Sequence, residues 1–147
     1  MKFADFFEGQ IITTDSCTVT EEEIIAFAKQ YDPQWFHVSP ELALQGPFSG
    51  LIASGWHSCG IAMRLMVDHV LHDSESFASP GLSYVKWHHP VRPEDTLRVR
   101  AEVLEVRRSE SKTDLGILRW QWQMTCSNSL LILRMSSLGL HTNYFQS

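Results

Sequence analysis

The sequence GWHSCGIAMRLMVDHVLH, residues 55–72, is the most informative stretch for the fold. In a helical conformation its apolar side chains cover most of the helix circumference, with few polar interruptions. A helix that is apolar nearly all round is buried nearly all round, so we expect this one at the centre of the domain. Its ~18 residues span about 27 Å, which is long enough to cross a small domain.

After this helix the hydrophobic period changes to two residues, which is typical of strands. The alternating runs are Leu82–Trp87, Leu97–Val103 and Leu118–Cys126, followed by a fourth run, Leu130–Leu140. At Val103-Leu104 the alternation slips by one residue, which predicts a β-bulge. Short connections favour antiparallel pairing of consecutive strands. One long antiparallel sheet wrapped around one apolar helix would bury both surfaces, so we predict an α+β fold.

A strand and a shorter helix are predicted before the central helix. Residues Gln10–Val19 are rich in β-branched side chains, which favour a first strand. Thr20 and Glu23 have the spacing of a capping box, which predicts that a helix begins there. Pro33 disfavours the α conformation at the residue before it, so we expect this helix to end at Asp32.

Length and composition fit one globular domain over residues 1–147, with 44% apolar and 20% charged residues. Twelve Lys and Arg against seventeen Asp and Glu give a net charge of −5, which disfavours a nucleic-acid partner.

No stretch reaches the ~20 apolar residues that span a bilayer, so we expect no membrane partner. The first residues lack the pattern of a secretory signal, so we expect a cytoplasmic protein. Its three cysteines, without a CxxC pair, are expected to be reduced and buried.

Asp32 and His37 are the first candidates for chemistry. They lie five residues apart directly after the predicted helix, where irregular backbone allows both side chains to reach one water. The negative partial charge at a helix C-terminus favours a protonated carboxyl, and a histidine titrates near neutrality, so such a pair can activate water and return a proton. The structural alternative is that Asp32 caps a turn before Pro33 and that His37 is a surface loop residue.

Ser54 and Gly55, at the start of the central helix, are the second candidates. The N–H groups in the first turn of a helix have no intrahelical partner and can stabilise a carbonyl oxygen that becomes negative. Gly55 would let that oxygen approach the backbone closely. The structural alternative is an N-cap serine followed by a glycine that serves only close packing.

Metal and nucleophile sites have less support. His88 and His89 are consecutive in a predicted strand and point to opposite faces, so they do not easily share an ion. His69 and His72 have a spacing compatible with ligation, but this pattern is more often a solvated helix end. Cys59 lacks an obvious base. We therefore expect no metal and no cofactor.

Three motifs together resemble the MaoC-like family of R-specific enoyl-thioester hydratases and dehydratases, a branch of the hot-dog fold. The first motif is Phe27-Ala28-x-x-x-Asp32-x-x-x-x-His37-x-x-Pro40-x-x-Ala43. The second is Ile52-Ala53-Ser54-Gly55, and the third is Pro90-Val91-Arg92-Pro93-Glu94-Asp95-Thr96-Leu97. The order and the separations of the motifs agree with the family, and the resemblance covers about residues 20–140.

The motifs also depart from the family pattern at five positions. Gln34 and Trp35 stand in place of Asn-Pro, Ser39 in place of an acidic residue, Ser54 in place of a common His and Glu94 in place of Gly. Because Asp32 and His37 match, the resemblance bears on the reaction type more than on the substrate. Trp35 and Trp56 could narrow or reshape the acyl pocket.

The resemblance implies reversible hydration of a 2-enoyl thioester to a (3R)-hydroxyacyl thioester. It assigns Asp32 and His37 to proton transfer and the Gly55 N–H to the enolate oxygen, with CoA or an acyl carrier protein as substrate carrier. Cations that could meet CoA phosphates are Arg92, Arg98, Arg100, Arg107 and Arg108, although such residues are more often solvated charges on a strand face.

Hot-dog subunits pair their sheets edge to edge, so the resemblance also implies a homodimer with the pantetheine tunnel near its interface. Two alternatives remain open. One is an acyl-CoA thioesterase on the same fold. The other is a non-catalytic acyl-thioester binding module, which would be favoured if Trp35 closed the space between Asp32 and His37.

Overall fold

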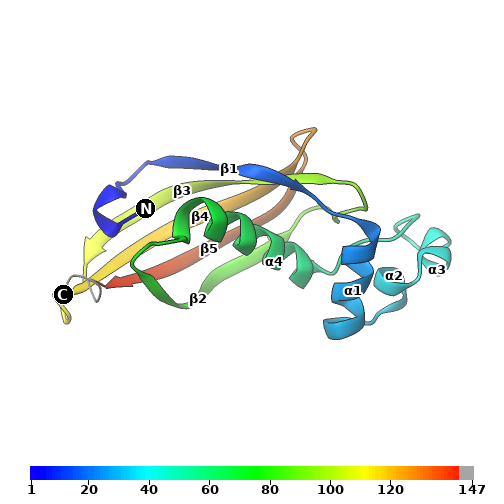
Figure 1. Ribbon diagram of the computed structural model, residues 1–147, viewed down its shortest axis with the longest axis horizontal. Helices are drawn as coiled ribbons and strands as arrows, with labels where there is room; N and C mark the ends of the chain where they lie inside the picture. Colours follow the sequence, from blue (N-terminus) through cyan, green and yellow to red (C-terminus); the bar gives the residue numbers. More distant parts are fainter. Residues whose placement is uncertain (143–147) are drawn as a thin grey trace.

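A five-stranded antiparallel sheet wraps around a helix in the computed structural model, which describes residues 1–142 (Figure 1). The helices are α1 (Glu21–Tyr31), α2 (Trp35–Val38), α3 (Pro40–Leu44) and α4 (Gly55–Met66), with short turns η1 (Phe3–Asp5) and η2 (Val67–Leu71). The strands are β1 (Ile11–Thr18), β2 (Ser76–Trp87), β3 (Thr96–Arg108), β4 (Leu115–Cys126) and β5 (Leu131–Thr142). This arrangement confirms the predicted α+β hot-dog architecture.

The strands follow the order β1-β3-β4-β5-β2 across the sheet. Antiparallel pairing of consecutive strands is confirmed for β3 with β4 and for β4 with β5. It is wrong for β2 and β3, because β2 pairs with β5 at the opposite side of the sheet. The connection after β2 crosses the end of the sheet instead of forming a hairpin. It is held there by fully buried Val91, whose carbonyl accepts a hydrogen bond from the Ala53 N–H at 2.9 Å.

Two local predictions are confirmed in detail. The register of β3 and β4 shifts between Val103 and Glu105, where the slipped alternation predicts a bulge. The capping box of α1 is formed, since the Thr20 hydroxyl accepts the Glu23 N–H and the Glu23 carboxylate accepts the Thr20 N–H. Helix α1 stops at Asp32, which is its C-cap, so the backbone leaves the helix where Pro33 requires it.

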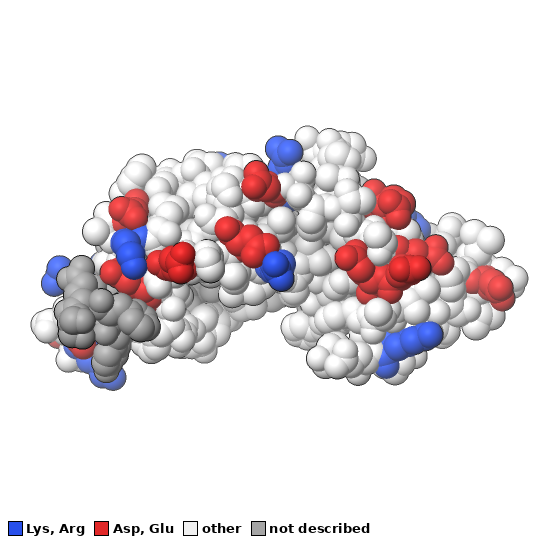
Figure 2. Space-filling view, in the orientation of Figure 1, with Lys and Arg blue, Asp and Glu red and all other residues white. Residues whose placement is uncertain are grey.

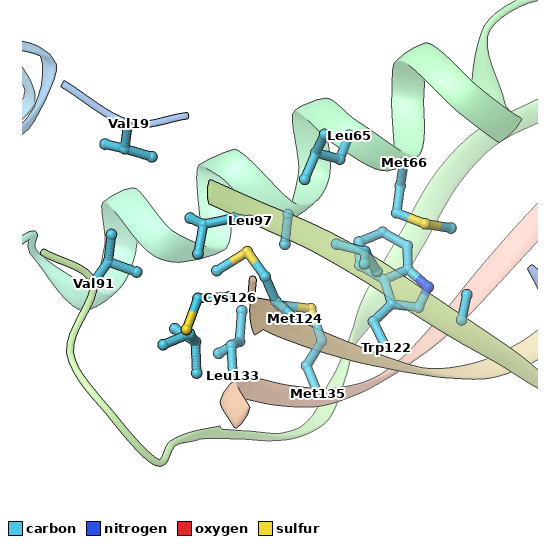
Figure 3. Close-up of a cluster of buried hydrophobic side chains, with 14 of the residues drawn as sticks. Val19, Leu65, Met66, Val91, Leu97, Trp122, Met124, Cys126, Leu133 and Met135 are labelled. Carbon is cyan, nitrogen blue, oxygen red and sulfur yellow. The ribbon is translucent and has the colours of Figure 1, made fainter. Parts of the chain in front are cut away.

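The central helix differs from the prediction in two respects. The α-helical hydrogen bonding ends at Met66, and residues 67–71 form a π turn. Burial is one-sided: Met66 packs into the core against the sheet (Figure 3), whereas Trp56 and Met63 are exposed. The sheet of one chain covers one side of α4, so the apolar residues on the other side remain open to solvent. Of residues 1–142, none belongs to a helix with the length and apolarity that crossing a membrane requires.

Candidate active site

A cavity of about 420 Å³ lies where α4 begins, at the end of the sheet that carries α1 and α2. It is lined by Asp32, His37, Phe48, Ile52, Ala53, Gly55, Trp56, Ser58, Trp87, His88, His89 and Pro90. Most of these residues come from the first motif, from the second motif with the start of α4, and from the end of β2, whose segment reaches the third motif at Pro90. The fold therefore brings the motifs together around one space.

The Asp32 carboxylate is held by three side chains. Because Asp32 caps α1, its side chain projects from the end of the helix toward the start of α4. The Ser54 hydroxyl donates to Asp32 Oδ2 at 2.7 Å, and the Gln34 amide donates to Oδ1 at 2.8 Å. His37 Nε2 lies 3.3 Å from Oδ2. Asp32 and His37 thus meet in direct contact on the cavity wall, as their spacing suggests.

His37 is fixed by a backbone carbonyl of the segment that precedes α4. It lies in the short helix α2 and is only 4% exposed, so the alternative that it is a surface loop residue is wrong. Its Nδ1 is 2.7 Å from the Ile52 carbonyl oxygen. Since a carbonyl can only accept, Nδ1 carries a proton and Nε2 is the nitrogen that faces Asp32.

The hydrogen bond from Ser54 holds the pKa of Asp32 below its usual value, aided by Gln34 and by the charge of His37 and opposed by partial burial. The expectation that the helix C-terminus favours a protonated Asp32 is therefore wrong. Donors at 2.7 and 2.8 Å stabilise the carboxylate more than the helix end destabilises it. His37 Nε2 faces Asp32 Oδ2 at 3.3 Å, so the two groups are placed for a proton to pass directly between them.

Ser54 and Gly55 open α4 as the sequence indicates. Ser54 is fully buried, and its hydroxyl accepts the Trp56 N–H at 3.3 Å while donating to Asp32. Its proton is therefore directed to the carboxylate. A Cβ on Gly55 would lie 2.8 Å from the Trp87 ring, so close packing requires glycine here. Gly55 is the first residue of α4, so its N–H has no intrahelical acceptor, and the residue lines the cavity.

The two tryptophans of the candidate set lie in different places. Trp56 lines the cavity and makes an edge contact with Trp87, with ring centroids 5.5 Å apart. The Trp35 ring packs over Gly46, where a Cβ would lie 2.6 Å from it, and it is not part of the cavity lining. Trp35 does not separate Asp32 from His37, which touch each other directly.

Three of the departures from the family pattern have local explanations. Gln34 supplies one of the two hydrogen bonds that neutral side chains donate to Asp32. Ser39 caps α3 by accepting the Leu42 N–H at 3.3 Å. Glu94 has φ 67°, a left-handed conformation that glycine adopts at lower cost, which explains the glycine of the family pattern.

Sequence reasoning missed several residues of the site. Trp87, His88 and His89 line the cavity because β2 ends beside α4, which depends on the pairing of β2 with β5. The Ile52 carbonyl could not be singled out, because any residue has one.

Within residues 1–142, no group of three His, Cys, Asp or Glu side chains converges as metal ligands would. The three cysteines are free thiols; Cys126 is buried, whereas Cys17 and Cys59 are only partly buried.

Comparison with known proteins identifies the family. The family model described as "MaoC like domain" matches residues 3–119. The chain belongs to the MaoC-like dehydratase family. Asp32, His37 and Gly55 all lie in the part of the chain that this match covers.

Relatives of this MaoC-like chain agree with the match. YdeM of Bacillus subtilis (strain 168), described as uncharacterized, is 34% identical over 118 residues, which are 80% of this chain and 82% of YdeM. The 3-hydroxyacyl-thioester dehydratase Z of Mycobacterium tuberculosis is 32% identical over 95 residues, 63% of each protein. A crystal structure of a MaoC-like dehydratase from Rhodospirillum rubrum superposes with a TM-score of 0.88 at 32% identity, covering 95% of this chain and 94% of that one.

Proposed function

We propose that this MaoC-like protein adds water reversibly to a 2-enoyl thioester and forms the (3R)-hydroxyacyl thioester. The observation that supports this most strongly is the contact between His37 Nε2 and Asp32 Oδ2 at 3.3 Å on the wall of a cavity that also exposes the start of α4. Hydration needs a base for water and an acid for the α-carbon, and a carboxylate in contact with an imidazole can provide both.

The hydrogen bonds around the pair suggest which group performs which step. Asp32, as the carboxylate, accepts a proton from water while the oxygen of that water bonds to C3. His37 delivers the Nε2 proton to C2, so both new bonds form on one face of the double bond. Asp32 then holds the proton that came from water, and the direct contact lets it pass to His37 Nε2 for the next cycle. Dehydration follows the same steps in reverse.

The thioester oxygen becomes negative as the hydroxide adds to C3. The Gly55 N–H at the N-terminus of α4 is suited to donate a hydrogen bond to this oxygen, because first-turn amides have no intrahelical partner and carry positive partial charge. Ser54 does not compete for this role, since its hydroxyl proton is donated to Asp32 at 2.7 Å. In this proposal the serine orients the carboxylate, and the glycine amide holds the oxygen.

A spectrophotometric screen of enoyl-CoA esters, from short to long acyl chains, tests the proposal. We expect loss of the conjugated enoyl absorbance without release of free thiol, which a thiol-trapping reagent monitors in the same cuvette. Release of thiol from acyl-CoA would instead identify a thioesterase. Binding without turnover of any ester would identify a binding module.

We propose a homodimer as the working form. The edge of β2 that faces away from β5 has no partner strand within residues 1–142, and Trp56, Met63 and Phe77 leave apolar surface exposed. Edge-to-edge pairing with a second copy would satisfy the strand and cover these side chains. Light scattering at micromolar concentration should give twice the mass of the chain. A monomeric mass would contradict the proposal.

A further inference from the structure

The outer face of the sheet carries a charge opposite to that of the rest of the chain. Along β2–β5, side chains that point into the core alternate with side chains that point outward onto this face. The charged ones are Lys86, Arg98, Arg100, Glu102, Glu105, Arg107, Arg119 and Arg134. Six of these are cationic and two acidic, whereas the remaining sequence has six Lys and Arg against fifteen Asp and Glu. On the face that carries α4, acidic side chains gather over α1 (Figure 2).

The unpaired cations lie at the end of this face that is nearest the cavity. At the far end, Glu105 pairs with Arg107 at 2.9 Å and with Arg119 at 3.3 Å. Near the cavity, Arg98, Arg134 and Lys86 have no carboxylate partner within residues 1–142. The Nε atom of Arg134 is also buried without a hydrogen-bond acceptor in the described part of the chain.

These cations form a row across neighbouring strands. Arg100 is opposite Gln123, which is opposite Arg134, which is opposite Lys86, so the row spans about 14 Å at the usual strand spacing. Arg98 extends the row on the same face of β3, two residues before Arg100. Lys86 directly precedes Trp87, which lines the cavity, and β2 ends there. The basic row and the entrance to the site therefore lie beside the same end of β2, on opposite faces of the sheet.

We infer that this row is the docking surface for an acidic protein that carries the acyl thioester on a flexible arm. The inference rests on the proposed function. Among the residues that line the cavity there is no Lys or Arg, so recognition of the carrier by charge has to occur outside it. A partner docked on the row would place its arm beside His88 and His89, which follow Lys86 and Trp87 and lead into the cavity.

The surroundings of the row favour an acidic protein over a nucleic acid. Glu102 lies 3.4 Å from Arg100, so a continuous phosphate backbone would pass next to a carboxylate. Tyr84 is half-buried, and Lys86 Nζ lies over its ring at 5.4 Å from the centroid, so this face of the ring is not open to a stacking base. Separate carboxylates on a protein surface can meet the cations and avoid Glu102.

Two double variants of equal charge separate docking from catalysis. Arg98→Gln with Arg134→Gln removes unpaired cations of the row, and Arg107→Gln with Arg119→Gln removes the paired cations at the far end of the same face. Both are assayed with crotonyl-CoA and with a crotonyl-loaded acyl carrier protein. We expect the first variant to lower kcat/KM for the carrier-bound substrate by about tenfold, to reduce its salt dependence and to leave crotonyl-CoA unchanged. The second variant should leave both substrates unchanged.

Equal losses with both substrates would overturn the docking surface, as would no loss with the carrier-bound substrate. Fluorescence anisotropy of a labelled carrier protein measures docking without turnover. If neither thioester is hydrated, the proposed function fails, and binding lost only in the Arg98→Gln, Arg134→Gln variant still supports docking. Binding of a labelled mixed-sequence oligonucleotide that requires Arg98 and Arg134, with no carrier binding, would assign the face to nucleic acid instead.

Discussion

Two cavities of similar volume lie at opposite ends of the sheet, and each is lined by a buried histidine. The cavity at the start of α4 measures about 420 Å³ and contains His37. The cavity between η1 and the ends of β3–β5 measures about 430 Å³ and contains His141, which is 1% exposed. Volume and burial therefore do not distinguish the two.

The hydrogen bonds of the two histidines do distinguish them. His37 has Ile52 O on one ring nitrogen and Asp32 on the other. His141 has no partner for either nitrogen in the described part of the chain, and burial lowers its pKa. A buried imidazole without partners stays neutral, whereas one that is oriented by a carbonyl and paired with a carboxylate can hold and release a proton. The contrast supports the proposal that proton chemistry takes place at the α4 end.

Removing either member of the proton pair should have the largest effect. Asp32→Asn and His37→Ala should each lower kcat for enoyl-thioester hydration by roughly 10²–10⁴-fold, the usual contribution of a positioned acid or base. Steady-state kinetics measure the loss, and circular dichroism with a thermal melt checks that the fold is intact. Wild-type turnover in either folded variant would remove the functional difference between the two cavities.

Loss of the serine hydroxyl should have a smaller, pH-dependent effect. Because donation from Ser54 lowers the pKa of Asp32, Ser54→Ala should raise that pKa and move the acidic limb of the kcat/KM profile to higher pH. The hydrogen bond is to a charged group, so we expect activity at acidic pH to fall by about tenfold. A uniform loss at every pH, with the limb unmoved, would show that Ser54 acts only as a helix cap.

The substitution His141→Leu should leave activity unchanged. It should instead change how the free energy of unfolding depends on pH. Since burial places the folded pKa of His141 below 6.5, the unfolded chain binds more protons as the pH falls through that value, and the free energy of unfolding decreases. The leucine variant should therefore lose less stability between neutral and acidic pH than the wild-type protein.

Urea denaturation at both pH values, beside steady-state kinetics at neutral pH, measures the difference. A loss of turnover in a folded His141→Leu variant would mean that the second cavity takes part in the reaction.

Patterns within one segment of sequence predicted much of the fold. The capping box of Thr20 and Glu23 and the slipped alternation at Val103 are both present in the structure, because each depends on residues a few positions apart. The partner of β2 was mispredicted, because the pairing is decided by a connection that Val91 anchors across the end of the sheet. The burial of α4 was overestimated, since apolar side chains do not reveal how far a sheet extends around them.

The candidate site shows the same limit. Asp32 and His37 were found from their spacing after a helix, and the structure brings them into contact. The direction of the Asp32 pKa was mispredicted, because it is set by Ser54, 22 residues further along the chain. The position of the Trp35 ring depends on its packing over Gly46 and has no signal in the local sequence.

Hydration of crotonyl-CoA in D₂O, with the product analysed by NMR and by chiral separation, tests the central claim most directly. An imidazole and a carboxylate in contact on one wall of the cavity should add deuterium to C2 and the hydroxyl group to C3 from the same face. The account predicts the (3R)-hydroxy product with deuterium in one diastereotopic position at C2. A (3S) product, or deuterium distributed over both positions, would contradict it.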